Sequence, residues 1–262
     1  MLKNIAKIIL QSRSVTIRRV VDGGELMILA NGPSLADTIR DQAERLRHTD
    51  CMAVNFAANT PAYFDIKPKY YVMADPHFFT RADDPNVSRL YDNLRATSWP
   101  MTLLVPRQYS AIARRRLDGS GVEVMTFNFV GLEGPAWFER LCYRHRLGMP
   151  RPRNVLIPSL MCAIWLGYSD IKIAGADHSW LQSIWVDDDN HVVSVQPHYY
   201  KEDKKEEQRI RSDYQAYHLH DILLSFHIAF KSYFGVRRYA DHAGVRITNI
   251  TPGSYIDAFP RS

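Results

Sequence analysis

Short apolar runs alternate with amphipathic segments along most of the chain. The runs with the length and composition of strands are 25–30, 51–54, 70–74, 101–105, 122–125, 171–174 and 245–250. Most are apolar at consecutive positions and rich in Val, Ile and Met, which is typical of parallel strands buried on both faces. Helical patterns fall between them at 35–47, 108–117, 135–147, 159–167 and 204–234. The alternation predicts an α/β fold, a modified Rossmann-like and doubly wound sheet that is mainly parallel.

The segment 183–196 departs from this alternation. Two β-rich arms flank Asp187, Asp188, Asp189 and Asn190, which predicts a hairpin with these polar residues at its tip. Asp187 and Asp189 also satisfy the loose Asp-x-Asp pattern of divalent-metal sites in sugar-nucleotide enzymes. The turn accounts for both acids without a metal and is the preferred interpretation. We expect one domain over 1–262, in which residues 178–205 form a small lid.

Composition excludes several classes of protein. With 262 residues, of which 46% are hydrophobic, the chain can fill a full-sized core without disulfides. Its three cysteines lie far apart with no Cys-x-x-Cys pair, which fits a reducing, cytoplasmic setting. No apolar run approaches the roughly 20 residues that a membrane-spanning helix needs, and no signal-peptide pattern is visible.

The net charge of +5 and the pI near 9.1 predict an anionic partner. No nucleic-acid recognition motif accompanies the charge, so nucleic acid is not the expected partner. Residues 1–20 form a basic amphipathic segment, with Leu2, Ile5, Ile8 and Ile9 at helical spacing beside lysines and arginines. Two interpretations stay open: a peripheral helix on an anionic membrane surface, such as the inner face of the cytoplasmic membrane, or a helix packed on the domain or a second subunit.

The sequence LANGPSLA follows the first apolar run and contains a turn of unusual composition. Gly32 allows another group to approach the backbone, Pro33 sets φ, and Ser34 is placed to cap the following helix. Asn31 adds an amide that can bind a phosphate or a ribose. A ligand site and an ordinary capped turn both explain this motif taken alone. It is neither a GxGxxG fingerprint nor a P-loop.

Three further strands also end in small or polar residues. One closes at Asn55, another at Asp75 before a proline, and a third at the sequence Gly175-Ala176-Asp177-His178. Because the carboxyl ends of parallel strands meet at one edge of a sheet, we expect these residues to line one crevice with Asn31.

These motifs resemble, in order, those of the bacterial sialyltransferases of the Campylobacter type, glycosyltransferase family 42, and their wider relatives. The residues that carry the resemblance are ILANGPSL, VNFA, MADP, PSLMCAIWLGY leading into SDIKIAGADHSW, and ITNITPGSYIDAF. The resemblance implies a modified Rossmann domain with a lid, and transfer of sialic acid, Kdo or a related acidic sugar from a CMP donor. The acceptor would be a hydroxyl of a bacterial surface glycan or glycolipid.

The resemblance also implies roles for individual residues. Gly175, Ala176 and Asp177 match a Gly-x-Asp motif that packs against the cytidine and its ribose. Asp75 stands where the family has an asparagine in an Asn-Pro pair, which is a departure from its pattern. The remaining donor-binding candidates are Asn31, Gly32, Pro33, Ser34, Asn55, Asn154 and Ser159.

Catalysis in this family uses a histidine on the lid as the general base, and the matching candidate is His198. A histidine titrates near neutral pH and can take the proton of an acceptor hydroxyl. His178 competes for this role, and Asp177 is the carboxylate to consider if a nucleophile is used instead. Tyr199 and Tyr200 are candidate hydroxyl donors to the departing phosphate.

We expect no metal and no other cofactor. His218, His220 and His227 fall on one predicted helix, and residues two apart point to different faces, so they do not suggest a shared ion. Basic residues gather at 114–116 and 144–153, where an anionic acceptor site and an ordinary solvated face both remain open. Two other functions also stay open: a pterin pyrophosphokinase-like enzyme, which would need ATP and Mg²⁺, and a non-catalytic nucleotide-binding accessory protein. A homo-oligomer is compatible with the sequence.

Overall fold

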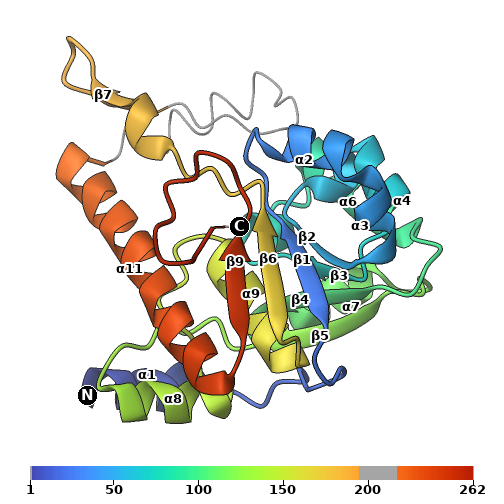
Figure 1. The fold of residues 1–262 in the computed structure, drawn as a ribbon, viewed down its shortest axis with the longest axis horizontal. Coiled ribbons are helices and arrows are strands. Elements are labelled where there is room, and N and C mark those ends of the chain that lie inside the picture. Colours follow the sequence, from blue (N-terminus) through green and yellow to red (C-terminus); the bar gives the residue numbers. More distant parts are fainter. Residues whose placement is uncertain (1, 195–216, 262) are drawn as a thin grey trace.

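The computed structural model describes residues 2–194 and 217–261, and within them seven parallel strands form one sheet (Figure 1). Each predicted strand is confirmed, with ends shifted by one or two residues. The strands are β1 (Glu25–Leu29), β2 (Asp50–Val54), β3 (Tyr70–Val72), β4 (Thr102–Pro106), β5 (Glu123–Phe127), β6 (Asp170–Ala174) and β9 (Arg246–Asn249). Their order across the sheet is β5-β4-β3-β2-β1-β6-β9.

Both faces of the sheet are covered, as the apolar runs predicted. In β1, Leu26 and Ile28 belong to one buried cluster, whereas Met27 and Leu29 belong to another. Side chains alternate between the two faces of a strand, so an apolar residue at every position requires helices on both sides. The fold is therefore the expected doubly wound α/β arrangement.

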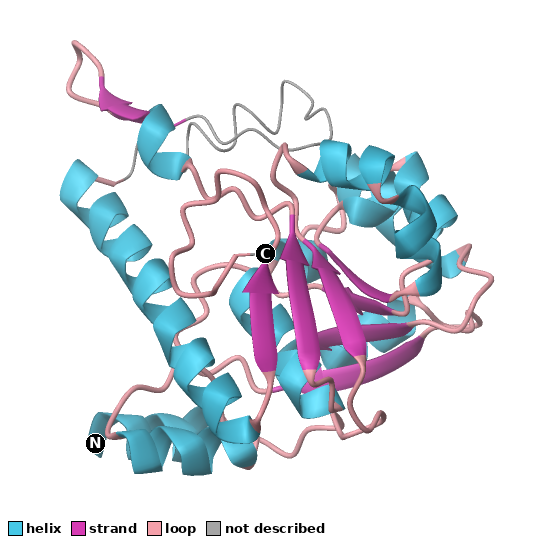
Figure 2. Cartoon of the chain, in the orientation of Figure 1, coloured by secondary structure: helices cyan, strands magenta, loops and turns pink. Residues whose placement is uncertain are grey.

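Helices form a layer on each face of the sheet (Figure 2), and the two layers come from different parts of the chain (Figure 1). One face is covered by α2 (Leu35–Asp41), α3 (Ala43–His48), α4 (Pro61–Ile66), α5 (His77–Thr80), α6 (Pro85–Arg95) and α7 (Ser110–Arg116). The other face carries α8 (Ala136–Arg144), α9 (Leu156–Leu166) and α11 (Leu219–Ala243). The helix α1 (Leu2–Gln11) lies beside that second layer. Among the described residues, no helix combines the length and the apolarity needed to cross a bilayer.

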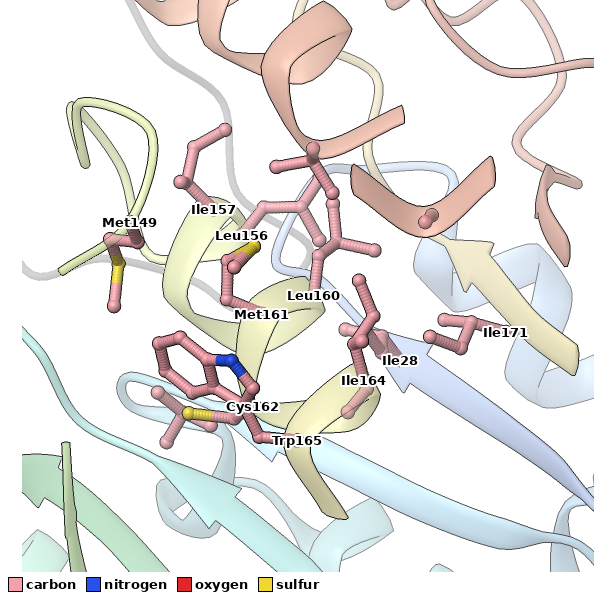
Figure 3. Close-up of a cluster of buried hydrophobic side chains, with 14 of the residues drawn as sticks. Ile28, Met149, Leu156, Ile157, Leu160, Met161, Cys162, Ile164, Trp165 and Ile171 are labelled. Atoms are coloured by element: carbon pink, nitrogen blue, oxygen red, sulfur yellow. The ribbon is translucent and has the colours of Figure 1, made fainter. Parts of the chain in front are cut away.

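Helix α9 is the centre of the larger core. Every one of its residues is buried, and Leu160 and Ile164 lie on the side of the helix towards Ile28 and Ile171 of the sheet (Figure 3). A helix that is apolar on all sides must be enclosed by other elements. The sheet, α8 and α11 enclose it, and α9 thereby fixes where α11 passes over the sheet.

Several helices differ from the sequence-based expectation. The predicted helix 35–47 is divided into α2 and α3, and the short helices α4 and α5 were not predicted. Helix α6 was not predicted, although Asp84 accepts a hydrogen bond from the Asn86 amide at its N-terminus and Pro85 follows, which is a recognisable start signal. The predicted helix 204–234 begins at Leu219 among the described residues and continues to Ala243. Gly235 lies inside the helix, where a Cβ would come within 3.2 Å of the Pro150 ring, and Gly244 at φ 70° provides the C-terminal cap.

The hairpin predicted at 183–196 is confirmed over its described residues, which end at Ser194. Strands β7 (Ile184–Val186) and β8 (Val192–Ser194) pair antiparallel after the short 3₁₀ helix η3 (Trp180–Ser183). Asp187 Oδ1 accepts hydrogen bonds from the amides of Asp189 (3.1 Å) and His191 (2.8 Å). Asp187 thus serves as a turn residue. The lid function of residues 178–205 stays a prediction, and its part beyond Ser194 lies outside the described residues.

The connection order reverses between β1 and β6. Strands β1 to β5 are added one after another towards one edge, and the chain then returns to place β6 on the other side of β1. In doubly wound sheets, ligands bind outside the carboxyl ends of the strands at such a switch point. The residues that follow β1 and β6 are therefore the first place to look for a site.

Candidate functional site

The chain segments that leave β1 and β6 run side by side at the switch point. The strand pairing is extended by hydrogen bonds from Ala30 N to Ala174 O (2.9 Å) and from Gly32 N to Gly175 O (2.7 Å). A Cβ atom on Gly32 would lie 2.7 Å from the carbonyl oxygen of Gly175, closer than real Cβ contacts come. Gly32 is thus required by the approach of β6 to its backbone.

Gly175 has a similar steric constraint. Its φ is 69°, and a Cβ there would lie 2.6 Å from Leu35 Cβ. The next residue, Ala176, donates its amide to the hydroxyl of Thr251 (3.0 Å), which ties the end of β6 to the segment after β9. These contacts hold the predicted Gly-x-Asp motif in place, so that Asp177 lies beside the turn that follows β1.

Asp177 and Ser34 are joined directly. The carboxylate oxygen Oδ2 of Asp177 accepts from the Ser34 hydroxyl at 2.9 Å and from the Ser34 amide at 3.3 Å. The sequence-based expectation that the Ser34 side chain caps its own helix is wrong, since Ser34 has αR dihedrals and makes no side-chain cap. The hydroxyl instead points across to β6.

Asn31 is buried without a partner. Only 7% of the residue is exposed, and neither its side-chain oxygen nor its side-chain nitrogen has a hydrogen-bond partner among the described residues. A buried amide left unpaired costs about 1–3 kcal/mol. Such a group in a ligand-binding region of the fold is a candidate to bind something that supplies both an acceptor and a donor.

Asn154, Tyr233 and His178 form a chain of hydrogen bonds from three separate segments. Asn154 Oδ1 accepts from the amide of Leu156 (3.0 Å) at the start of α9 and from the Tyr233 hydroxyl (3.1 Å). The Tyr233 hydroxyl oxygen then lies 2.6 Å from His178 Nε2. Since Tyr233 donates to Asn154, His178 Nε2 carries the hydrogen, and its Nδ1 keeps the free electron pair.

Burial sets the protonation state of His178. Its ring is packed among Trp180, Phe230 and Tyr233, with the centroid of Trp180 4.2 Å away. Desolvation by this burial lowers the pKa of His178 to about 3. Its backbone φ is 52°, an uncommon value for a residue with a side chain. The imidazole is therefore neutral at physiological pH. The side-chain nitrogen of Asn154 is buried beside these hydrogen bonds and has no partner among the described residues.

Asn55 and Asp75 lie further along the same edge. The register of the sheet pairs Leu29 with Ala53 and with Ala174, so Asn31 falls level with Asn55 on one side and Ala176 on the other. Asn55 has φ 52°, and its carbonyl oxygen accepts from the Tyr71 hydroxyl at 2.6 Å. Asp75, at the end of β3, is exposed, and its carboxylate accepts from the His77 amide at 2.8 Å.

Three of the expected residues lie at one edge of the sheet, and the crevice that they were expected to line stays a prediction. Asn55, Asn31 and Asp177 follow three adjacent strands, spaced about 4.8 Å from one another in a sheet. Ser159 is placed differently, because it is fully buried in α9 and its hydroxyl donates to Val155 O at 2.8 Å. His198, Tyr199 and Tyr200 lie outside the described residues, and their roles stay predictions.

Sequence reasoning did not single out Tyr233 or Thr251. Tyr233 lies in the predicted helix 204–234, was given no role there, and is fully buried in α11. No local sequence pattern distinguishes a tyrosine that only packs in the core from one whose hydroxyl forms a hydrogen bond with a histidine. Thr251 lies in the closing segment ITNITPGSYIDAF, whose likeness to the family had been noted without a role for this residue.

No three His, Cys, Asp or Glu side chains gather at metal-binding distances within the part of the chain that is described. His218 instead begins α11, where its backbone amide donates to Asp221 (3.2 Å) in a capping box. Metal independence itself remains a prediction that needs a measurement.

Of the comparisons with known proteins, the one with solved structures bears on the fold. No family model matches the chain, and no curated protein matches it either. Among solved structures, the chain is similar to the MAf glycosyltransferase from Magnetospirillum magneticum AMB-1, with a TM-score of 0.54 and 10% sequence identity. The match covers 99% of this chain but only 37% of that chain. The α/β architecture of this chain is therefore one that a glycosyltransferase also uses.

Proposed function

We propose that the protein is a glycosyltransferase that moves an acidic sugar from a CMP donor to a hydroxyl of a bacterial surface glycan. Three facts support the proposal. The fold is similar to that of a glycosyltransferase. The polar residues gather at the topological switch point of a doubly wound sheet. The strand-end motifs resemble those of the Campylobacter-type sialyltransferases in the same order along the chain.

The observation that carries the proposal is the unpaired amide of Asn31. Its oxygen and nitrogen are both buried, and they lie beside the one corner that joins β1 to β6. A nucleoside monophosphate offers phosphate and ribose oxygens to an amide N–H and a ribose hydroxyl to an amide oxygen. We assign Asn31, Gly32 and Asn55 to the phosphate and ribose of the donor, and Asp177 to the ribose.

The proposed reaction needs one proton acceptor. The acceptor hydroxyl attacks the anomeric carbon, a new carbon–oxygen bond forms, the bond to the phosphate breaks, and CMP leaves with its electron pair. The hydroxyl proton passes to a base. The low pKa of His178 makes it a poor base near neutral pH, which favours a hydrogen-bonding role for it and leaves His198 as the proposed base.

A panel of nucleotides in a thermal-shift experiment tests the donor class. A ligand that binds only the folded protein raises its melting temperature, so CMP should stabilise the wild-type protein more than UDP, GDP or ATP. The Asn31→Leu variant should lose the response to CMP. A response to UDP or ATP alone would reject the CMP donor.

Enzymatic assays separate the other candidate functions. With a CMP-sugar donor and an acceptor glycan, we expect turnover that EDTA leaves unchanged and that His198→Ala reduces by roughly 10²-fold or more, as for loss of a general base. Turnover of ATP that EDTA abolishes would support a pyrophosphokinase instead. Full biological function of His198→Ala without nucleotide binding would support an accessory protein.

A further inference from the structure

Helix α1 is attached to the rest of the protein by its polar side. The side chain of Asn4 donates to Glu133 O, and the Lys7 ammonium donates to Gly131 O at 3.3 Å. Just after the helix, the Ser12 hydroxyl donates to Leu147 O. These contacts join the start of α1 to the residues before α8 and its end to the residues after α8, so the two helices run alongside each other in the same direction (Figure 1).

The apolar side of α1 faces outward as a consequence. Leu2, Ile9 and Leu10 are 83%, 71% and 68% exposed, and Ile5 is also exposed. No residue of α1 is buried, and only Ile8 packs partly against the core. An amphipathic helix on a globular domain normally turns its apolar face inward. The reverse orientation indicates that this face has a partner that the isolated chain lacks.

Helix α8 presents a second exposed apolar stripe beside α1. Trp137 and Leu141 are 60% and 51% exposed and lie one helical turn apart. Arg140, Arg144 and His145 share the exposed side of this helix. We call Leu2, Ile5, Ile9, Leu10, Trp137 and Leu141, with the basic residues Lys3, Arg140 and Arg144, the α1–α8 surface.

Charge on the α1–α8 surface is of one sign. Helix α1 contains no acidic residue. The acid of α8, Glu139, is buried and is paired with Arg238 at 3.2 Å. Within residues 2–194 and 217–261, no carboxylate forms a salt bridge with Lys3, Arg140 or Arg144. The surface therefore offers positive charge together with bare apolar side chains.

We propose that the α1–α8 surface docks the protein onto an anionic lipid membrane. Exposed leucine and isoleucine side chains can enter the acyl boundary, tryptophan favours the interface, and lysine and arginine attract acidic headgroups. A second copy of this chain is the less favourable occupant, because pairing the surface with itself would bring like charges together without a compensating acid. The positive charge of the α1–α8 surface therefore favours an anionic membrane over a second copy of this chain.

The docking surface is separate from the candidate site. Arg238, near the C-terminal end of α11, pairs with α8, whereas the hairpin β7–β8 lies at the opposite end of α11 (Figure 1). From Leu219 to Arg238 the helix spans about 28 Å at 1.5 Å per residue. A membrane-bound protein would therefore hold the hairpin away from the lipid, and the site would remain open to soluble donor.

Vesicle flotation tests the docking surface. The wild-type protein should float with vesicles of equimolar phosphatidylcholine and phosphatidylglycerol and should stay behind with phosphatidylcholine alone. Ile9→Asp/Leu141→Asp should weaken partition by more than about tenfold, since each side chain contributes apolar burial in the membrane. Arg140→Gln/Arg144→Gln should weaken it by roughly 30-fold, about fivefold for each basic residue.

Two controls keep the test decisive. Leu224→Asp changes an equally exposed leucine on α11 and should leave flotation unchanged, with circular dichroism confirming that every variant folds. Brominated phosphatidylcholine mixed with phosphatidylglycerol should quench wild-type fluorescence, and Trp137→Phe should remove most of that quenching. Equal binding to neutral vesicles, or a lipid-free dimer that Ile9→Asp converts to a monomer, would overturn the proposal.

Discussion

The carboxylate of Asp177 accepts hydrogen bonds from both the hydroxyl and the amide of Ser34, two residues that lie 143 positions apart in the chain. This contact joins the ends of β1 and β6 at the point where the strand order reverses. A hydrogen bond to a charged group contributes more than one between neutral groups. The pair therefore fixes the corner in which Asn31 lies unpaired.

Separate and combined substitution of this pair should give a measurable coupling energy. Ser34→Ala and Asp177→Asn should each lower the free energy of unfolding by about 1–2 kcal/mol, since each weakens a charge-assisted hydrogen bond. The double variant should lose less than the sum, by at least about 0.5 kcal/mol. Urea unfolding of the four proteins measures the difference, and strictly additive losses would contradict the direct interaction.

Asn31 should be dispensable for stability. In the absence of nucleotide, Asn31→Leu should leave the free energy of unfolding unchanged or raise it by about 1–2 kcal/mol, because it removes a buried amide that has no partner in residues 2–194 and 217–261. Asn249→Leu is the matched control. That buried side chain donates to Ser254 Oγ at 2.9 Å and accepts from the Thr251 amide at 3.1 Å, so its loss should cost about 2–4 kcal/mol. Equal destabilisation by the two substitutions would assign Asn31 a structural role.

Gly32→Ala should destabilise the protein by about 1–3 kcal/mol. The added Cβ would lie 2.7 Å from the backbone oxygen of Gly175, which belongs to the neighbouring strand end and cannot move as a side chain would. Gly121→Ala provides the comparison, because a Cβ there meets nothing within 4 Å. The melting temperatures of the two variants check this, and a Gly32→Ala protein as stable as Gly121→Ala would show that the corner is looser than described.

Burial of His178 should make stability depend on pH. Its pKa is lowered from 6.5 to about 3 in the folded protein, so the unfolded chain binds the extra proton first as the pH falls. The stability gained from keeping His178 neutral is fully present above pH 6.5 and is lost progressively as the pH falls below that value. Between pH 7 and pH 5 the loss from this one group should be about 2 kcal/mol.

The variant His178→Phe isolates that contribution. It keeps a ring in the pocket and leaves the Tyr233 hydroxyl bonded to Asn154, but it has no proton to bind. The unfolding free energy of His178→Phe should therefore change less than that of the wild-type protein between pH 7 and pH 5. Parallel pH dependences in the two proteins would show that the folded protein does not hold His178 neutral.

The strands and the polar strand ends could be predicted from the sequence. Apolar runs such as 25–30 and 171–174 reflect a sheet that is buried on both faces. Every position of such a parallel strand is buried, so the strand can be recognised from consecutive apolar residues alone. The turn residues Gly32 and Gly175 were recognisable because a close approach to the backbone, as at Gly32, and a positive φ, as at Gly175, both favour glycine. Parallel pairing then placed Asn31, Asn55 and Asp177 at one edge.

Other features of the site depend on contacts between distant segments. Ser34 was predicted to cap its own helix by accepting from a backbone amide, but its αR dihedrals give no such cap. Its hydroxyl donates instead to the carboxylate of Asp177, which arrives from β6. Tyr233 carries the signature of an ordinary core residue, and only the approach of α11 to α9 places its hydroxyl between His178 and Asn154.

The sequence by itself determined the alternation of strands and helices and the amphipathic character of residues 1–20, since both depend on the order of side chains along one segment. Only the tertiary structure decided which way α1 faces and which strand lies beside β1. Hydrophobic periodicity indicates that one face of an element needs a partner. Which partner covers that face is decided by hydrogen bonds and packing between residues far apart in the chain, and these contacts leave no local sequence pattern.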